Sequence, residues 1–128
     1  MVKMEQDIST LVGVALRKHQ QRDFAGAEAI YKQVLAQDSK CADALHLYGC
    51  LCDDLGRTDE AVALISTAVQ CNSLAYPYYY NLANILCKQG RYTEAILQYR
   101  TAVKLKPDYA AAHNNLGMIY REQKNFTK

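Results

Sequence analysis

The sequence predicts an all-α protein built as a solenoid of stacked, antiparallel helix pairs. The chain repeats itself with a step of 34 residues, each copy carries two stretches of apolar residues at helical spacing, and small residues return at fixed positions. A single helix pair cannot bury both of its faces, so the copies must stack on one another. Half of the 128 residues are hydrophobic and 22% are charged, a composition that can form a core.

The repeat defines one domain over residues 1–128, with three full copies at 8–41, 42–75 and 76–109 and a partial copy at 110–128. One position holds Gly or Ala in all four copies, and a second position holds Ala. Small side chains there let two helices cross closely, while larger apolar residues beside them fill the grooves. The first position is Ala15, Gly49, Ala83 and Gly117, and the second is Ala27, Ala61 and Ala95.

Each copy contains two predicted helices. The first, seen in "ALHLYGCLCDDLG" and "YYYNLANILCKQG", ends at a glycine, Gly56 or Gly90, which suits a helix C-cap. After a short polar turn the same apolar period resumes in "TDEAVALISTAV" and "YTEAILQYRTAV". Thr58 and Thr93 stand at the start of these second helices, and we expect them to act as N-caps.

The third copy opens with the tyrosine-rich stretch "YPYYYNLANIL". Pro77 fits the first turn of a helix, where its missing N–H costs nothing. Tyr79 falls in the core position, and we expect Tyr76 and Tyr78 to pack between helices. Tyr80 points toward the inner face, where it either packs against other helices or lines a groove.

The third copy also carries a pattern that resembles the tetratricopeptide repeat, a family of helix-pair arrays. The resemblance extends over residues 8 to 128. It implies a right-handed superhelix in which the first helix of each pair lines a concave surface, and such surfaces bind a peptide or protein segment. The residues that carry the pattern are Tyr79, Leu82, Ala83, Leu86, Ala95, Tyr99 and Pro107.

The resemblance places candidate peptide-binding residues on this concave surface. They are His46 and Cys50 from the second copy, Tyr80, Asn81, Asn84 and Lys88 from the third, and Asn114, Asn115, Met118 and Arg121 from the fourth.

"YYNLANIL" and "EAILQYRTAVKLKPDYAAAHNNLG" are similar to repeats of O-GlcNAc transferase arrays, which use one inner asparagine per repeat as a ladder along the substrate backbone. Here the ladder position is occupied by Gly13, Leu47, Asn81 and Asn115, so two of its rungs are present. The family's carboxylate clamp for chaperone tails is matched at Asn81 alone, so we do not expect chaperone-tail binding.

No arrangement of residues points to catalysis, a cofactor or a metal. His19, His46 and His113 are far apart in the sequence and lack metal-ligand spacing, and we expect the cysteines, Cys52 above all, to be packing residues. The odd number of cysteines suggests a reducing compartment, and no apolar run approaches the ~20 residues of a membrane span. We therefore expect a cytoplasmic protein that is not an enzyme.

Charge is unevenly distributed along the chain. Residues 1–64 carry seven basic and ten acidic residues, a net charge of −3, whereas residues 65–128 carry eight and three, a net charge of +5. Two explanations of this asymmetry stay open. It is either chance variation on solvated faces or a sign that the acidic end of one molecule meets the basic end of another. The basic residues Arg100, Lys104 and Lys106 lie along one predicted outer helix and indicate a solvated face, not a nucleic-acid site.

The end of the chain suggests a second route to association. The sequence stops where an eighth helix would begin, so we expect Leu116, Ile119 and Tyr120 to lose the helix that would cover them. Two hypotheses correspond to this: the chain is a truncated piece of a longer protein, or this face packs on another copy to form a homo-oligomer through the exposed helix.

The leading interpretation is therefore a scaffold module that binds an extended peptide or protein segment in a concave groove, without a nucleic-acid or membrane partner. Two alternatives stay open. One is a structural repeat module that associates with itself. The other is the substrate-recognition part of a glycosyltransferase related to O-GlcNAc transferase.

Overall fold

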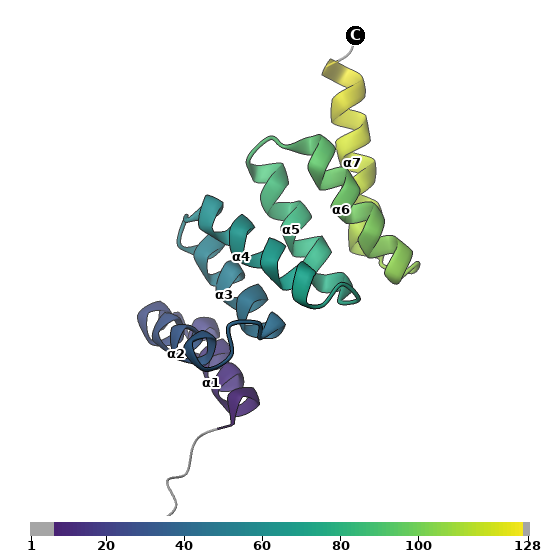
Figure 1. Cartoon of the computed structure of the whole chain (residues 1–128). Helices are drawn as coiled ribbons and strands as arrows, with labels where there is room; N and C mark the ends of the chain where they lie inside the picture. The colour runs from purple at the N-terminus through teal and green to yellow at the C-terminus, as the bar shows by residue number, and fades with distance from the viewer. Residues whose placement is uncertain (1–6, 127–128) are drawn as a thin grey trace, which may run out of the picture. The chain divides into compact units, whose positions relative to one another are not determined.

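In the computed structural model the described residues, 7–126, form seven α-helices connected by short turns (Figure 1). The first helices of the pairs begin at residues 8, 42, 76 and 110, which are 34 residues apart. The predicted all-α architecture of helix pairs is confirmed. The helices are α1 (Ile8–Gln20), α2 (Phe24–Gln37), α3 (Ala42–Asp54), α4 (Thr58–Cys71), α5 (Tyr76–Lys88), α6 (Tyr92–Leu105) and α7 (Ala110–Phe126).

The helices belong to two compact units that meet in sequence between Cys71 and Asn72. In the first unit α1 packs on α2, α2 on α3, and α3 on α4; in the second α5 packs on α6, and α6 on α7. Residues 65–71 carry no charge, so the first unit has the whole net charge of −3 and the second the whole +5. None of the helices in residues 7–126 is long and apolar enough to cross a membrane.

Small residues sit where paired helices cross. A Cβ atom added to Gly49 of α3 would collide with the Ile65 side chain and lie 3.2 Å from the carbonyl oxygen of Ala61, both on α4. Ala61 itself is fully buried. The predicted close crossing is therefore confirmed at Gly49. It is wrong for Gly117 of α7, where an added Cβ would meet nothing within 4 Å, because no described helix crosses α7 at this point.

The first helix of each full pair ends in the same backbone turn. Gly56 and Gly90 adopt φ angles of +80° and +74°, so the predicted glycine caps are confirmed. Arg22 adopts the same left-handed conformation after α1, with φ +66° and no glycine to relieve it. In each turn two backbone N–H groups donate to the end of the helix. The pairs are Arg22 to His19 and Asp23 to Lys18, Gly56 to Asp53 and Arg57 to Cys52, and Gly90 to Cys87 and Arg91 to Leu86, all at 2.8–3.0 Å.

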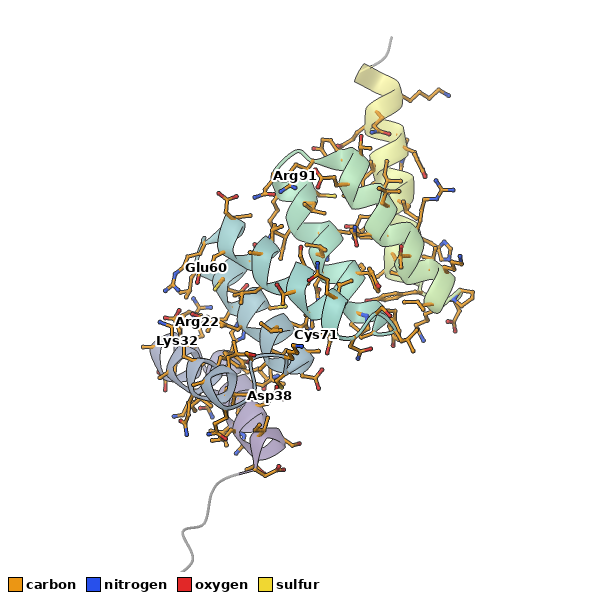
Figure 2. The ribbon with its side chains drawn as sticks, viewed as in Figure 1. Arg22, Lys32, Asp38, Glu60, Cys71 and Arg91 are labelled. Atoms are coloured by element: carbon orange, nitrogen blue, oxygen red, sulfur yellow. The ribbon has the colours of Figure 1, made fainter. Side chains whose placement is uncertain are left out.

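The predicted threonine N-caps are wrong. α4 begins at Thr58 itself and α6 at Tyr92, with Arg91 at the N-cap position of α6. Arg91 is labelled in Figure 2. The turn that follows each glycine is so short that the arginine after it already occupies the cap, which places both threonines inside their helices. A side-chain cap is found instead at α2, where Asp23 accepts a hydrogen bond from the Gly26 N–H at 3.0 Å.

The tyrosines at the start of α5 pack as expected. Tyr78 and Tyr79 are buried, and the Tyr79 hydroxyl donates to the Ser73 carbonyl at 2.9 Å. The Tyr76 ring meets the Tyr109 ring edge-on, with the centroids 5.1 Å apart. These contacts tie the beginning of α5 to the turns before α5 and α7.

The prediction for the fourth copy needs two corrections. α7 continues without a turn to Phe126, since the position that holds Gly56 and Gly90 in earlier copies holds Lys124 here. Leu116 and Ile119 are 8% and 5% exposed, so they are covered and not left open as expected. Of the three residues expected to be uncovered, Tyr120 alone is exposed.

Candidate functional site

Three helices of the second unit bring polar side chains into one hydrogen-bonded cluster. Tyr99 of α6 donates its hydroxyl proton to the Oδ1 atom of Asn84 on α5. Asn115 of α7 donates from Nδ2 to the same Oδ1 atom at 3.1 Å and to the Tyr99 hydroxyl at 3.2 Å. The Tyr80 hydroxyl lies 3.4 Å from Asn115 Nδ2. The side chains of the cluster therefore hold one another in fixed orientations.

This cluster forms one wall of a hollow of about 360 Å³ that opens to solvent. Apolar surface is contributed by Met118 and Ile119 of α7, while Lys88 and Glu122 bring one positive and one negative charge. The formal charges of the lining residues therefore cancel. Its lining residues are Asn84, Cys87, Lys88, Tyr92, Tyr99, Asn115, Met118, Ile119 and Glu122.

Burial of Tyr99 and Cys87 determines their protonation. Tyr99 is 1% exposed and anchors the cluster in the core of the second unit, where burial raises the pKa of its hydroxyl above the usual value. The Cys87 thiol lies 3.9 Å from that hydroxyl, and burial also raises its pKa. At neutral pH Cys87 is thus a protonated thiol, which is a poor nucleophile.

Aromatic packing extends from the cluster along the second unit. The Tyr80 ring lies 5.9 Å from the Tyr99 ring and 5.0 Å from the Tyr109 ring, measured between centroids. The Lys106 ammonium stands 5.2 Å above the Tyr76 ring. Tyr80 therefore packs against other rings, and its hydroxyl also reaches the polar cluster.

The candidate residues of the second unit occupy different environments. Asn84, Lys88, Asn115 and Met118 line the hollow, and Tyr80 adjoins them. The others stay outside its lining: Asn81 is half-buried on α5, while Asn114 and Arg121 are exposed on α7.

The two candidates of the first unit, His46 and Cys50, lie one turn apart on α3. Cys50 Sγ and His46 Nε2 are 3.6 Å apart. Burial lowers the pKa of His46 to about 4, although Asp43 opposes the shift, and burial raises the pKa of Cys50 to about 12. Both side chains are neutral near pH 7, so this pair offers neither a thiolate nor an imidazolium.

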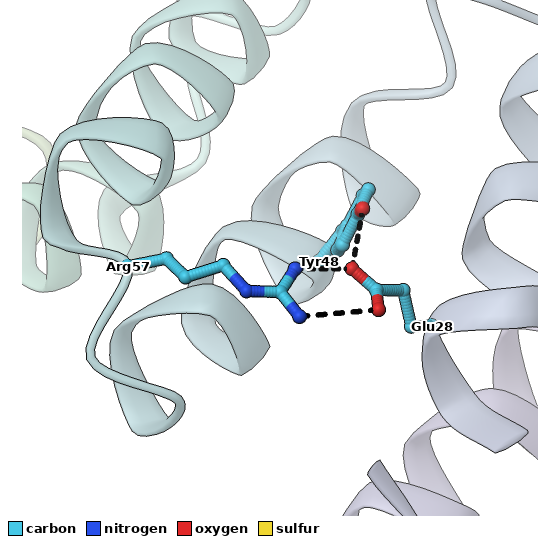
Figure 3. Close-up of polar contacts among 3 residues, drawn as sticks. All are labelled: Glu28, Tyr48 and Arg57. Atoms are coloured by element: carbon cyan, nitrogen blue, oxygen red, sulfur yellow. Dashed lines mark hydrogen bonds and ion pairs between the residues drawn. The ribbon is translucent and has the colours of Figure 1, made fainter. Parts of the chain in front are cut away.

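An ion pair that the sequence did not reveal joins α2 to the turn after α3 (Figure 3). Both terminal nitrogens of Arg57 contact the Glu28 carboxylate, and the Tyr48 hydroxyl donates to it at 2.8 Å. The hydrogen bonds from Arg57 and then Tyr48 lower the pKa of Glu28. The signal was a departure from the repeat, since the position of Glu28 holds Val62 and Ile96 in the next two copies.

A second unforeseen contact in the first unit joins α1 to α3. His19 Nε2 lies 2.6 Å from Asp54 Oδ2. The other ring nitrogen, Nδ1, is buried and has no hydrogen-bond partner among the described residues. His19 thus has one well-placed polar contact, and it links the first and second repeats.

The fold is that of a helical-repeat protein, and its second unit has a solvent-open hollow lined by α5, α6 and α7. The family pattern described as tetratricopeptide repeat matches residues 18–86, and a second, described as TPR repeat, matches residues 83–124. The chain belongs to the tetratricopeptide repeat family, which confirms the resemblance seen in the sequence.

Similar proteins include human Protein O-mannosyl-transferase TMTC1, which is 57% identical over 44 residues; these make up 34% of this chain and 5% of that protein. An O-GlcNAc transferase mutant from Thermobaculum terrenum has a similar structure, with a TM-score of 0.82 and 29% identity, covering 91% of this chain and 23% of the transferase chain. The chain thus spans a small part of either protein.

The first TPR of Spaghetti (RPAP3), whose structure has an HSP90 peptide bound, is similar with a TM-score of 0.88 and 17% identity over 94% of this chain and 96% of that one. At this identity the likeness establishes the shared fold alone.

Proposed function

We propose that the chain is a protein-interaction module that binds an extended peptide or protein segment along the first helices of its repeats. The hollow of the second unit carries this proposal. It presents amide groups from Asn84 and Asn115 beside the apolar surface of Met118 and Ile119, and it is open to solvent. Amides can both donate and accept hydrogen bonds, and the apolar wall can bury side-chain carbons of a ligand.

The RPAP3 structure supports a peptide as the ligand class, since that protein has a similar fold and is bound to an HSP90 peptide. The same partner is not proposed for this chain. Positions of the family's carboxylate clamp hold Val12, Leu16, Leu47 and Pro77, which cannot grip a carboxylate. A neutral or weakly charged internal segment suits the opposite, mutually cancelling charges of Lys88 and Glu122 better.

We further propose that the module recognises its ligand without transforming it. General acid–base or nucleophilic chemistry needs a group that is readily deprotonated or protonated near neutral pH. Burial shifts the pKa of the thiols of Cys50 and Cys87 upward and that of the His46 imidazole downward, away from that range. These shifts favour packing roles for the three residues.

A display library of linear peptides, selected on the folded chain, tests the proposal. The amide signals of an isotopically labelled sample would then be followed by NMR as a selected peptide is added. We expect the largest changes at Asn84, Asn115 and Met118, with few changes along the exposed face of α6. A library that yields no binder, or a binder mapped to Arg100 and Lys104, would overturn the proposal.

A second candidate function is substrate recognition for a glycosyltransferase. The identity of 57% to a segment of Protein O-mannosyl-transferase TMTC1 favours it, as does the likeness to an O-GlcNAc transferase. Sugars in O-linkage are attached to hydroxyl groups, so this function predicts that selected peptides are rich in Ser or Thr. Selected peptides without hydroxyl side chains would leave the general interaction module as the better account.

Self-association is the remaining alternative, and the opposite net charges of the two units, −3 and +5, favour it. It predicts dimers or larger species that grow with protein concentration and dissociate in high salt, because salt screens attraction between exposed charges. Light scattering over a concentration series at low and high salt would decide. A mass that stays monomeric under all conditions would exclude it.

A further inference from the structure

The polar cluster of the second unit leaves two hydrogen-bonding groups unused. Both lone pairs of Asn84 Oδ1 are taken, by the Tyr99 hydroxyl and by Asn115 Nδ2. The two Nδ2 protons of Asn115 are shared among three acceptors, which are that same Oδ1 atom, the Tyr99 hydroxyl and, at a longer 3.4 Å, the Tyr80 hydroxyl. Among the side chains that the structure describes, residues 7–124, no hydrogen bond reaches the Asn84 Nδ2 donor or the Asn115 Oδ1 acceptor.

Neither of these atoms is fully buried, and both side chains belong to the lining of the hollow. Asn84 and Asn115 line it, and neither atom is among the buried side-chain atoms without a partner in the described chain, which are His19 Nδ1 and Tyr31 Oη. The oxygen and nitrogen of each side-chain amide could be assigned the other way round. Exchanging them in both Asn84 and Asn115 would still leave one donor and one acceptor without a partner. Exchanging them in one residue alone would place two donors or two acceptors against each other. The hollow therefore offers a ligand one donor and one acceptor, whichever way the amides are assigned.

The open donor of Asn84 and the open acceptor of Asn115 select among ligand groups. A trans peptide group carries its N–H and C=O on opposite sides, so it cannot satisfy both positions from one side. A carboxylate accepts twice and leaves the Asn115 oxygen without a donor, while an ammonium group leaves the Asn84 N–H without an acceptor. A primary carboxamide has an oxygen and an N–H on the same edge, so it can accept from Asn84 and donate to Asn115 through two separate atoms. A Ser or Thr hydroxyl would have to do both through a single oxygen.

We propose that the hollow between α5, α6 and α7 is a subsite for a carboxamide side chain, glutamine or asparagine, of the bound segment. Its carboxamide pairs with Asn84 and Asn115, and its methylene carbons lie against Met118 and Ile119. This assignment rests on the proposed function, because the side chain belongs to the peptide that the module binds. It differs from a backbone ladder in that the bound segment is recognised by side-chain identity.

Single-residue probes test the subsite without requiring any longer peptide to bind. The labelled full chain is titrated with N-acetylglutamine methylamide, N-acetylglutamate methylamide and N-acetylnorleucine methylamide, and the side-chain NH₂ signals of Asn84 and Asn115 are followed by NMR. We expect saturable shifts with the glutamine probe. Binding of the other two should be about tenfold weaker, as for one lost hydrogen bond.

The variant Asn84→Asp sharpens the test. An aspartate at this position still accepts from Tyr99 and Asn115, so the cluster stays intact, but the open donor is replaced by an acceptor. The glutamine probe should then bind about tenfold more weakly. Asn72→Asp is the matched control, since it makes the same chemical change at an exposed residue of the second unit outside the lining of the hollow, where the Oδ1 atom still accepts from the Leu74 N–H.

The outcomes separate this inference from the proposed function. Equal responses to the three probes, no saturable shift with glutamine, or an Asn84→Asp variant that binds glutamine as the wild type does would each overturn the subsite. Failure of the peptide library to yield any binder would instead overturn the proposed function. Library binders without a recurring Gln or Asn would leave peptide binding in place and reject the carboxamide subsite.

Discussion

Replacing Tyr48 by Phe removes one hydroxyl from the ion-paired cluster of the first unit and changes little else. Tyr48 is 5% exposed, and its hydroxyl donates to Glu28 at 2.8 Å. A hydrogen bond to a charged group contributes about 1.5–3 kcal/mol to stability. The Glu28 carboxylate keeps both contacts from Arg57 after the substitution, so it is not left bare. We therefore expect a loss near the lower end, about 1.5 kcal/mol.

The same substitution has a predictable pH dependence. The pKa of Glu28 is lowered in the folded protein from 4.5, so its stabilising contribution is complete above 4.5 and is lost as the pH falls through the folded value. Once the carboxyl is protonated the bond from Tyr48 is no longer charge-assisted. The cost of Tyr48→Phe should therefore be smaller at a pH below the folded-state pKa of Glu28 than at pH 7.

Urea unfolding followed by circular dichroism measures both effects. Tyr79→Phe is the control, because Tyr79 is buried to a similar degree and its hydroxyl donates to a neutral acceptor, the Ser73 carbonyl. Its cost should not change with pH. The reasoning is refuted if Tyr48→Phe costs nothing at pH 7, or if its cost and that of Tyr79→Phe respond alike to acid.

Three further predictions concern the repeat and its buried groups. Ala95 is fully buried, so Ala95→Phe should cost about 1–3 kcal/mol of stability. Leu97→Phe, on the exposed face of α6, should be near neutral. If neither variant changes the urea midpoint, the close helix crossing at Ala95 is wrong. Gly56 has φ +80°, so Gly56→Arg should lose about 1–2 kcal/mol, although Arg22 tolerates the same conformation at its own site; a gain in thermal stability would contradict this. His46 has its pKa lowered from 6.5 to about 4, so the unfolded state binds the proton first and stability should fall as the pH drops from 6.5 toward 4. His46→Gln should flatten that slope, and a slope equal to that of the wild type would exclude His46 as its source.

The repeat period predicted the elements whose conformation depends on the local chain. Gly56 and Gly90 marked helix ends because a left-handed turn favours glycine, and the structure has that turn at both. Arg22 escaped notice because the same turn there is formed by a residue that carries no such signal. The threonine caps failed for a similar reason, since the arginine before each helix took the cap position in turns too short to admit another residue.

Contacts between side chains on different helices could be predicted less well. Asn84 and Asn115 were recognised as inner-face residues, but their junction with Tyr99 depends on how α5, α6 and α7 pack, which spacing along the chain does not specify. Glu28 is the clearer case. Its partners Tyr48 and Arg57 come from another helix and a turn, so the acidic residue at an apolar repeat position was a signal without a visible partner.

The central claim is that the hollow of the second unit holds a peptide, and one pair of variants tests it most directly. Met118 lines the hollow and is 48% exposed, while Leu97 on α6 is 58% exposed and lies outside it. Both are apolar, helical and exposed, so replacing either by Glu should leave the fold intact. The affinity of a library-selected peptide would be measured by calorimetry for Met118→Glu and Leu97→Glu. The account predicts that binding falls at least about tenfold for Met118→Glu, as expected when a charge enters an apolar contact, and is unchanged for Leu97→Glu. Equal affinity for both variants, or a loss confined to Leu97→Glu, would contradict it.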